Sequence, residues 1–243
     1  MIKIENTEIT GWEAAIRGMR NPMNSWEKSD SLTCNNCKGC SPSQECDRYN
    51  NGTFIGHNDY NLMLRLCNAG ADHRKFMRMI TVYVDITAPF YWWKEFDTYK
   101  VGTVANSCST MHKIADREFV LDDFSCEHLI DYDLYSCNET DGPVINGAPH
   151  IGCGGLQLLS LTINTLNYYR NKYISTKDKK YWWQMIQLLP SSYNQKRTVM
   201  LNYEVLANMY KSRKNHKLDE WHDFCDWVTT LPYSELIIGD SNG

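Results

Sequence analysis

Residues 79–103 read MITVYVDITAPFYWWKEFDTYKVGT and carry the clearest structural signal in the chain. Its first part alternates between apolar and polar positions, with the β-branched residues Ile80, Val82, Val84 and Ile86 on one face. This period of two predicts a β-strand over residues 79–87. The proline that follows suits the first turn of a helix made of the aromatic run FYWWKEF. The stretch KVGT is then expected to form the loop after this helix.

A second stretch repeats the order of strand and then helix. Residues 189–213 read LPSSYNQKRTVMLNYEVLANMYKSR, in which residues 197–203 alternate again and predict a second strand. Apolar residues from Val205 onward follow helical spacing, and the predicted helix ends near Arg213. Each unit therefore carries a basic residue, Lys100 or Arg213, near its end.

Apolar spacing and helix start and stop signals predict the other helices. One covers about residues 59–69, with Asn58 as its N-cap and Gly70 as its stop. Three more are predicted: one after Gly154 and Gly155, one over about residues 177–188, and a last one with Leu218, Trp221, Cys225 and Val228 on one face. Two strand-then-helix units around a helical middle indicate an α+β fold.

The length of 243 residues fits one domain, because single hydrophobic cores stop growing near about 250 to 300 residues. We therefore predict a single α+β domain over residues 1–243. Residues 31–56 are rich in Cys, Asn, Gly and Ser and are interpreted as an excursion from this domain. Residues 115–153 hold turn residues and acids, and their pattern predicts no element.

Charge and hydropathy exclude two broad classes of function. Charged residues make up 22% of the chain and the formal net charge is −4, so a general nucleic-acid binder with a strongly basic face is not expected. No apolar run approaches the roughly 20 residues that cross a bilayer, and residues 1–5 lack the apolar segment of a signal peptide. We expect a soluble, cytoplasmic protein with no membrane partner and with most of its cysteines reduced.

Four cysteines lie close together within the excursion, at Cys34, Cys37, Cys40 and Cys46. Four thiolates at such short spacing match tetrahedral zinc or an iron–sulfur cluster. The alternative is a Cys-rich excursion that holds no metal, because the spacing differs from that of common paired zinc knuckles. Both interpretations stay open at the level of the sequence.

Two tryptophan pairs have two possible roles. Trp92, Trp93, Trp182 and Trp183 are large enough to stack on a flavin or a base. Large aromatic residues at helical spacing are more often part of a core or of a subunit interface, and packing is the interpretation preferred here.

Together the two stretches resemble the two core segments of the flavin-dependent thymidylate synthases, also called the thymidylate synthase complementing protein family. In that family a strand, Ala-Pro and an aromatic helix precede an Arg-His-Arg-x-x-Ser motif, and the second segment carries two asparagines and an arginine at the spacing of Asn202, Asn208 and Arg213. The resemblance implies an antiparallel sheet flanked by helices and a homotetramer with sites between its subunits. It also implies FAD as the cofactor and deoxyuridylate (dUMP) as the nucleotide.

The residues that the resemblance assigns to sites depart from the family in several places. Thr98-Tyr99-Lys100 stands at the Arg-His-Arg position, Thr103 at its serine, and Glu95 at a family glutamine, where an acid would repel a phosphate or accept a hydrogen bond from a base amide. The residues assigned to the flavin are Arg78, Asn202 and Asn208. Those assigned to the nucleotide are Glu95, Lys100, Thr103, Ser107, Ser109, Arg197 and Arg213.

Two functions from different classes follow. The first is a variant methyl or hydroxymethyl transfer to a pyrimidine nucleotide, with FAD as the cofactor. The alternative is a catalytically inactive protein that sequesters or senses a nucleotide, for instance a phage-borne protein that acts on a nucleotide signal. Loss of most of the basic motif together with retention of Arg213 favours the alternative, so enzymatic activity is left open.

Overall fold

The computed structural model describes residues 2–33, 53–131, 144–145, 148–149 and 154–239 of the chain. The described residues form two compact units. The first comprises residues 88–93 and 107–195, and the second comprises residues 2–87, 94–106 and those from 196 onward. The single domain predicted from the sequence stays a prediction.

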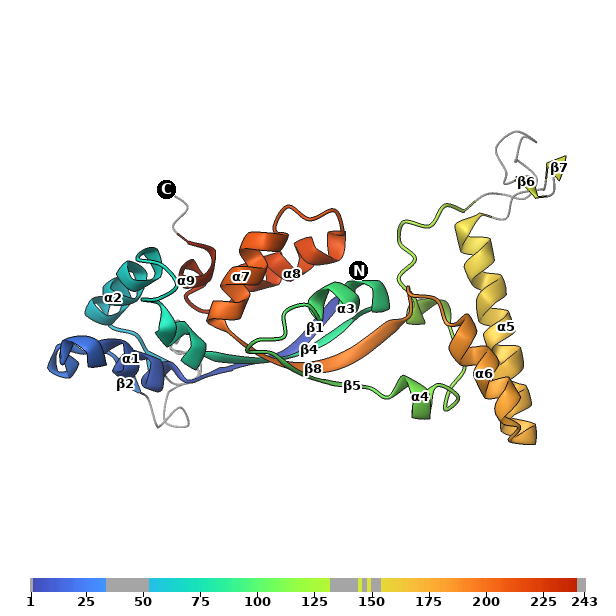
Figure 1. Ribbon diagram of the computed structural model, residues 1–243, viewed down its shortest axis with the longest axis horizontal. Coiled ribbons are helices and arrows are strands. Elements are labelled where there is room, and N and C mark those ends of the chain that lie inside the picture. The colour runs from blue at the N-terminus through green and yellow to red at the C-terminus, as the bar shows by residue number, and fades with distance from the viewer. Residues whose placement is uncertain (1, 34–52, 132–143, 146–147, 150–153, 240–243) are drawn as a thin grey trace, which may run out of the picture. The chain divides into compact units, whose positions relative to one another are not determined.

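A four-stranded sheet runs in the order β1 (Lys3–Thr10), β4 (Thr81–Pro89), β8 (Asn194–Asn202) and β5 (Val104–Ser107), as Figure 1 shows. β1 and β4 are antiparallel, with Lys3 opposite Thr87 and Thr10 opposite Thr81. The register shifts between Glu5 and Glu8. The sequence predicted the two inner strands and missed the two outer ones. β1 and β5 contain few buried apolar residues, so they lack the alternation that marks a half-buried strand.

β4 confirms the alternation in its sequence. Val82, Val84 and Ile86 are buried, whereas Tyr83 between them is 40% exposed. The predicted boundaries shift, because residues Lys75–Met79 form the 3-10 helix η4 and the strand begins at Thr81. Pro89 ends the strand instead of opening the helix, and α3 follows as Phe90–Phe96.

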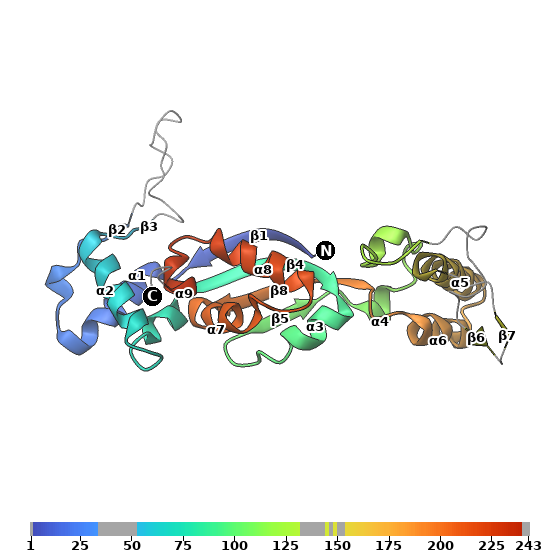
Figure 2. The same ribbon diagram turned by 90° about the horizontal axis from the view of Figure 1, so that it is seen from above.

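Three helices of the second unit pack against one another. They are α7 (Tyr203–Arg213), α8 (Asp219–Thr229) and α9 (Glu235–Ile238). Figures 1 and 2 show α7 and α8 over the same face of the sheet. The buried side chains that they contribute include Leu206, Met209, Trp221, Phe224 and Val228. The apolar spacing predicted from the sequence for both α7 and α8 is therefore confirmed.

The same unit includes α1 (Trp12–Arg20), the 3-10 helices η1 (Asn21–Met23) and η2 (Trp26–Lys28), the strand pair β2 (Leu32–Thr33) and β3 (Thr53–Phe54), and α2 (His57–Asn68). The predicted cap of α2 was wrong. Its first turn is capped from outside the helix, because the backbone N–H groups of Asn58 and Asp59 donate to the Asp30 carboxylate at 2.9 and 3.1 Å.

The first unit is built around two helices, α5 (Gly155–Thr176) and α6 (Lys179–Leu188), which pack against each other in Figures 1 and 2. Both were predicted from the sequence. The remaining elements are α4 (Thr110–Lys113), the 3-10 helix η5 (Leu121–Asp123), and the strand pair β6 (Val144–Ile145) and β7 (Ala148–Pro149).

The core of this unit draws on a segment that the sequence left unassigned. Phe119 and Phe124, from the region 115–153, pack with Ile163 and Leu166 of α5 and with Met185 of α6. Aromatic residues in an irregular segment have no periodicity, so no sequence pattern predicted their burial. Among the residues that the structure describes, no helix has the length and apolar character that crossing a membrane requires.

Candidate functional site

Arg213 and Glu95 meet although 118 positions separate them in the sequence. Arg213 is the last residue of α7, and Glu95 lies near the end of α3. Nη1 of Arg213 donates to Oε2 of Glu95 at 2.6 Å, and its Nε donates to the hydroxyl of Tyr99 at 2.9 Å. The fold thus brings together two of the residues that the sequence assigned to the nucleotide.

Two further side chains approach the same carboxylate oxygen of Glu95. Nε1 of Trp221 donates to Oε2 at 3.0 Å, and Nε2 of His216 lies 3.2 Å from it. Nδ1 of His216 accepts the backbone N–H of Leu218 at 3.2 Å, which orients the imidazole. Oε2 of Glu95 therefore accepts hydrogen bonds from an arginine and an indole and lies next to an imidazole.

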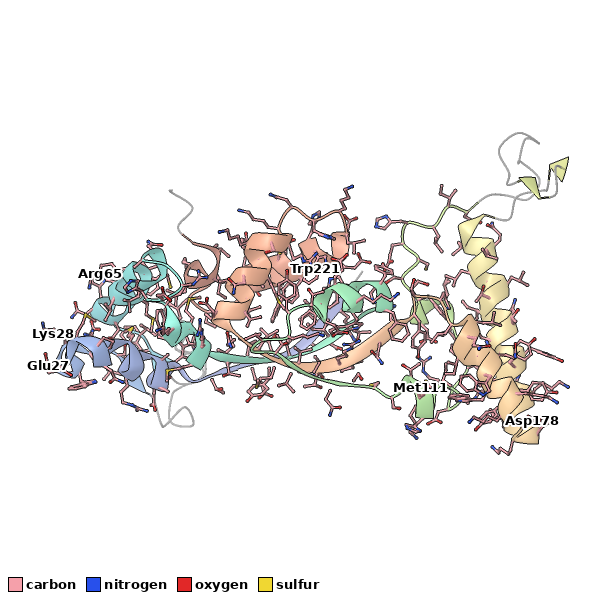
Figure 3. The ribbon with its side chains drawn as sticks, viewed as in Figure 1. Glu27, Lys28, Arg65, Met111, Asp178 and Trp221 are labelled. Carbon is pink, nitrogen blue, oxygen red and sulfur yellow. The ribbon has the colours of Figure 1, made fainter. Side chains whose placement is uncertain are left out.

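Aromatic rings hold the guanidinium of Arg213 in place. Its central carbon lies 4.8 Å from the ring centroid of Trp221 and 5.5 Å from that of Tyr99. Trp221 is fully buried and lies on the side of α8 that faces the sheet, as Figure 3 shows. Cation–π contacts of this kind orient an arginine more strictly than a single ion pair does. We call Glu95, Tyr99, Arg213, His216 and Trp221 the Arg213 cluster.

The electrostatics of the Arg213 cluster favour a neutral polar ligand group over an anion. The carboxylate of Glu95 compensates the charge of Arg213, and the two side chains are 34% and 17% exposed. A phosphate dianion that approached Arg213 would meet this carboxylate at hydrogen-bond distance. The edge of a base, which offers both donors and acceptors, matches such a paired site.

Asn202 and Gly102 form a second close contact in the second unit. Asn202 is the N-cap of α7, and its Oδ1 accepts the backbone N–H of Val205 at 3.0 Å. Gly102 has a φ of +78°, and a Cβ there would lie 3.0 Å from both Nδ2 of Asn202 and Cγ2 of Val205. The loop after α3 is also held by Thr103, whose hydroxyl donates to the carbonyl of Tyr99. The amide of Asn202 therefore lies against the loop that carries Lys100.

Asn208 lines a cavity of about 260 Å³. Its Oδ1 accepts a hydrogen bond from Nη2 of Arg74 at 3.3 Å, and Lys211 and Lys214 line the same cavity. Arg74 also pairs with Glu204 at 2.9 Å. Three cationic side chains and an amide thus surround this space. The thiol of Cys67 lies in the same wall, and burial raises its pKa to about 12, so it is held as a neutral thiol.

The other predicted site residues lie apart from these contacts. Arg78 is exposed in η4 and Lys100 is exposed in the loop after α3. Arg197 on β8 pairs with Asp97 at 2.8 Å. Ser107 ends β5 and Ser109 caps α4 by accepting the backbone N–H of His112 at 3.2 Å, and both belong to the first unit. Their assignment to the nucleotide stays a prediction.

Metal ligands predicted at Cys34, Cys37, Cys40 and Cys46 lie outside the described residues. Within the described ranges, no group of three or more His, Cys, Asp or Glu side chains is arranged to hold a metal ion. The tryptophan pairs divide in two: Trp92 and Trp93 are buried, as the packing interpretation predicted, whereas Trp183 on α6 is 43% exposed.

Another cavity lies away from the Arg213 cluster, between α1 and α2. Its volume is about 880 Å³, and its lining includes Arg20, Lys28 and Arg65. Figure 3 labels Lys28 and Arg65 at this end of the second unit. Nε of Arg20 donates to Oδ1 of Asp59 at 2.6 Å, and both side chains are almost fully buried. This ion pair is structural, because the guanidinium also donates to the carbonyls of Ser25 and Lys28 and so holds the turn after α1.

Sequence reasoning missed His216 and Tyr99 as members of the cluster and assigned Trp221 only to packing. Tyr99 was noted only as a departure from a basic motif, and a lone histidine is usually a satisfied surface or core group. Trp221 has helical spacing with Cys225 and Val228, which is the signal of a core residue. In the fold the ring of Trp221 is buried, as predicted, and its indole N–H also donates to Glu95, which the sequence did not predict.

The sheet and the helices that cover it form an α+β architecture that is also found in solved structures. Thymidylate synthase X from Helicobacter pylori, solved with FAD and dUMP, is similar with a TM-score of 0.60 and 15% identity over 97% of this chain and 96% of that chain. The UMP/dUMP methylase PolB from Streptomyces cacaoi, bound with 5-bromo-UMP, has a TM-score of 0.55 and 11% identity over 97% and 93%.

The chain thus has the fold of the flavin-dependent thymidylate synthases, as its two core segments predicted. The same methylase bound with 5-bromo-dUMP matches with a TM-score of 0.51. No protein-family model and no curated protein sequence matches this chain. The likeness therefore lies in the three-dimensional structure.

Proposed function

We propose that this chain binds a pyrimidine nucleotide at the Arg213 cluster and is a divergent member of the thymidylate synthase X type. The observation that carries the proposal is the meeting of Arg213 with Glu95, two residues assigned to the nucleotide separately. Arg213 supplies hydrogen-bond donors, Glu95 an acceptor, and Tyr99 an aromatic ring beside them. These are the groups that recognise a base by its edge and its face. The ligands of the similar structures, dUMP and UMP analogues, support the same class of ligand.

The phosphate of the nucleotide requires a separate cationic site, because Glu95 compensates Arg213. Lys100 is exposed in the neighbouring loop and is proposed for this role, and Thr103 would join it only if its hydroxyl turned away from the carbonyl of Tyr99. Arg197 is engaged with Asp97 on the sheet and would contribute only if that pair opens. A phosphate held by one lysine and hydroxyls binds more weakly than one held by a bidentate arginine.

FAD is the proposed cofactor, and the residues assigned to it fit a flavin in part. Nδ2 of Asn202 faces the loop at Gly102, while Asn208 lines a cavity with Lys211 and Lys214, whose charges suit a diphosphate. Glu204 compensates the charge of Arg74 in the same wall. This cavity, about 260 Å³, is smaller than the roughly 300 to 1,000 Å³ typical of small-molecule sites. A whole dinucleotide would therefore need walls from a second copy of the chain. When bound, a reduced flavin supplies a hydride.

A homotetramer would supply such walls. Three large apolar residues of α5, Leu158, Leu161 and Tyr168, are 55 to 59% exposed and share one face of the helix. An apolar stripe of this kind is typical of a protein–protein interface. It supports association between copies, and sedimentation of the purified protein measures the number of copies.

The second candidate is a catalytically inactive nucleotide-binding protein. A specific observation favours it: the Arg-His-Arg position holds Thr98-Tyr99-Lys100, and the Tyr99 hydroxyl is occupied by Arg213. Only one cation of the three remains at this position, and it is exposed. A site with two fewer positive charges is expected to bind the anionic nucleotide and FAD together more weakly.

An absorbance spectrum of the purified protein between 300 and 550 nm tests the cofactor, followed by mass spectrometry of any small molecule that heat releases. A flavin spectrum supports methyl or hydroxymethyl transfer, and dUMP with a folate one-carbon donor is then the assay. Bound nucleotide without flavin supports the inactive binding protein. Isothermal titration with dUMP, dTMP and dCMP that gives no heat with any of them contradicts nucleotide binding in both forms.

A further inference from the structure

The two carboxylate oxygens of Glu95 have unequal surroundings. Oε2 accepts hydrogen bonds from Arg213 and Trp221 at 2.6 and 3.0 Å, and Nε2 of His216 lies 3.2 Å from it. Oε1 accepts no hydrogen bond within the part of the chain that the structure describes. One oxygen therefore anchors the carboxylate, and the other remains an acceptor with a fixed position.

Arg213 shows the complementary arrangement. Its Nε donates to Tyr99 and its Nη1 to Glu95, whereas Nη2 has no acceptor among the described residues. The rings of Trp221 and Tyr99 keep the guanidinium plane from turning. The cluster thus offers one free acceptor and one free donor on a pair of groups that are already locked together.

We infer that Glu95 determines base specificity, by accepting the ring N3–H of a uracil-type base while Arg213 donates to an adjacent carbonyl of that base. This inference rests on the proposed function and names the part of the nucleotide that the cluster recognises. An acceptor held by two donors keeps its position without reorganising when the ligand arrives. The anchored carboxylate also excludes a phosphate from this position, because displacing it would break two hydrogen bonds at once.

The geometry of the bases selects uracil over cytosine. In uracil the N3–H lies between two carbonyl groups, so either carbonyl can accept from Arg213 while N3–H donates to Glu95. In cytosine N3 is an unprotonated acceptor, and a carboxylate opposite it is repelled. Cytosine can bind only in a shifted position through its amino group. A uracil-type ring is therefore the better match.

Isothermal titration with dUMP and with N3-methyl-dUMP tests this assignment in the full-length protein, because the methyl group removes only the N3–H donor. In the unaltered protein we expect methylation to weaken binding roughly 10- to 100-fold, the value of a hydrogen bond to a charged group. In Glu95→Ala the same methylation should change the affinity less than about threefold, because the acceptor is gone. dCMP should bind the unaltered protein at least about tenfold more weakly than dUMP.

Two further variants keep the test decisive. Glu95→Gln retains the shape and an amide oxygen, so it should show an intermediate methylation penalty, and it serves if Glu95→Ala does not fold. Tyr99→Phe removes the acceptor of Arg213 but leaves Glu95 and its other donors, so dUMP and N3-methyl-dUMP should weaken by the same factor.

Equal methylation penalties in the unaltered protein and in Glu95→Ala would overturn the role of Glu95 while leaving nucleotide binding intact. Equal binding of dCMP and dUMP would overturn the preference for uracil. Failure of the unaltered protein to bind dUMP at all would overturn the proposed function, and this inference with it. The ratio of the affinities for dUMP and N3-methyl-dUMP is measured within one variant. A general loss of structure would lower both affinities and leave this ratio unchanged, so it is not mistaken for a loss of the N3–H contact.

Discussion

Nη1 of Arg213 lies 2.6 Å from Oε2 of Glu95, so the arginine at the end of α7 is neutralised by a carboxylate from α3. This pairing changes what the arginine can do. An unpaired arginine in a half-buried site would bind a phosphate, whereas a paired one with a free N–H is suited to a carbonyl. The departure from the family glutamine at Glu95 is thus a change in the chemistry of the cluster.

Arg213→Ala should weaken dUMP binding by about 1.5 to 3 kcal/mol, the value of a hydrogen bond to a charged group. Isothermal titration measures it. Lys217→Ala is the matched control, since it removes an exposed positive charge close to Arg213 in the chain. An equal effect of both substitutions would mean that net charge, and no specific contact, governs affinity.

Asp59→Asn should destabilise the protein by about 3 to 5 kcal/mol, because Arg20 would then be a buried charge without its partner. The free energy of unfolding in urea measures this change. The exposed pair Lys113 and Asp116 offers the comparison, and Lys113→Ala should cost less than about 1 kcal/mol. A small effect at Asp59 would show that water reaches the ion pair.

Acid should remove the contribution of Asp59 to stability. Burial by itself raises the pKa of Asp59, but hydrogen bonds from Ser29 and Ser31 and the guanidinium of Arg20 outweigh burial and lower this pKa below its ordinary value of 3.8. A lowered pKa contributes stability that is present above the unfolded value and is lost as the pH falls through the folded value.

Asp85 provides a second acid-sensitive group on the sheet. Hydrogen bonds from Thr198, Asn6 and Lys196 lower its pKa from 3.8 to about 2. The difference in unfolding free energy between the unaltered protein and Asp85→Asn should therefore be constant above pH 4 and shrink between pH 4 and pH 2. Urea titrations at several pH values measure it. A difference that grows on acidification would contradict the sign.

Gly102→Ala should destabilise the protein by roughly 1 to 3 kcal/mol, because it combines a positive φ with a close contact. A Cβ there would lie 3.0 Å from Nδ2 of Asn202 and from Cγ2 of Val205. Gly70→Ala is a matched control, since Gly70 has a φ of +102° and nothing within 4 Å of its Cβ position. The difference in unfolding free energy between the two variants measures the contact alone.

Asn202 has a structural role as well as a proposed flavin contact, and two substitutions separate them. Asn202→Ala should cost about 0.5 to 2 kcal/mol of stability, because α7 loses its cap. Asn202→Asp keeps an acceptor for the N–H of Val205 and should retain most of that stability, yet it loses the amide donor. If flavin binds, its absorbance should therefore fall in both variants while stability falls in only one.

The inner strands β4 and β8 and the helices α2 and α5 to α8 could be predicted from local sequence patterns. Their side chains alternate or recur with the period of the element, and that period is a local property of the chain. The sequence also marked Arg213, Glu95, Asn202 and Asn208, because their spacing matched a known template. The outer strands β1 and β5 were not predicted, because an edge strand with few buried residues has no such period.

Which of these residues meet could not be read from the chain and depends on its folding. Glu95 and Arg213 belong to different helices, and a contact between residues 118 positions apart depends on how α3 and α7 pack. The indole N–H of Trp221 reaches Glu95 in the same way, through a neighbour that no local pattern specifies. Periodicity is carried by each segment alone, whereas a hydrogen bond between distant side chains exists only once the chain has folded.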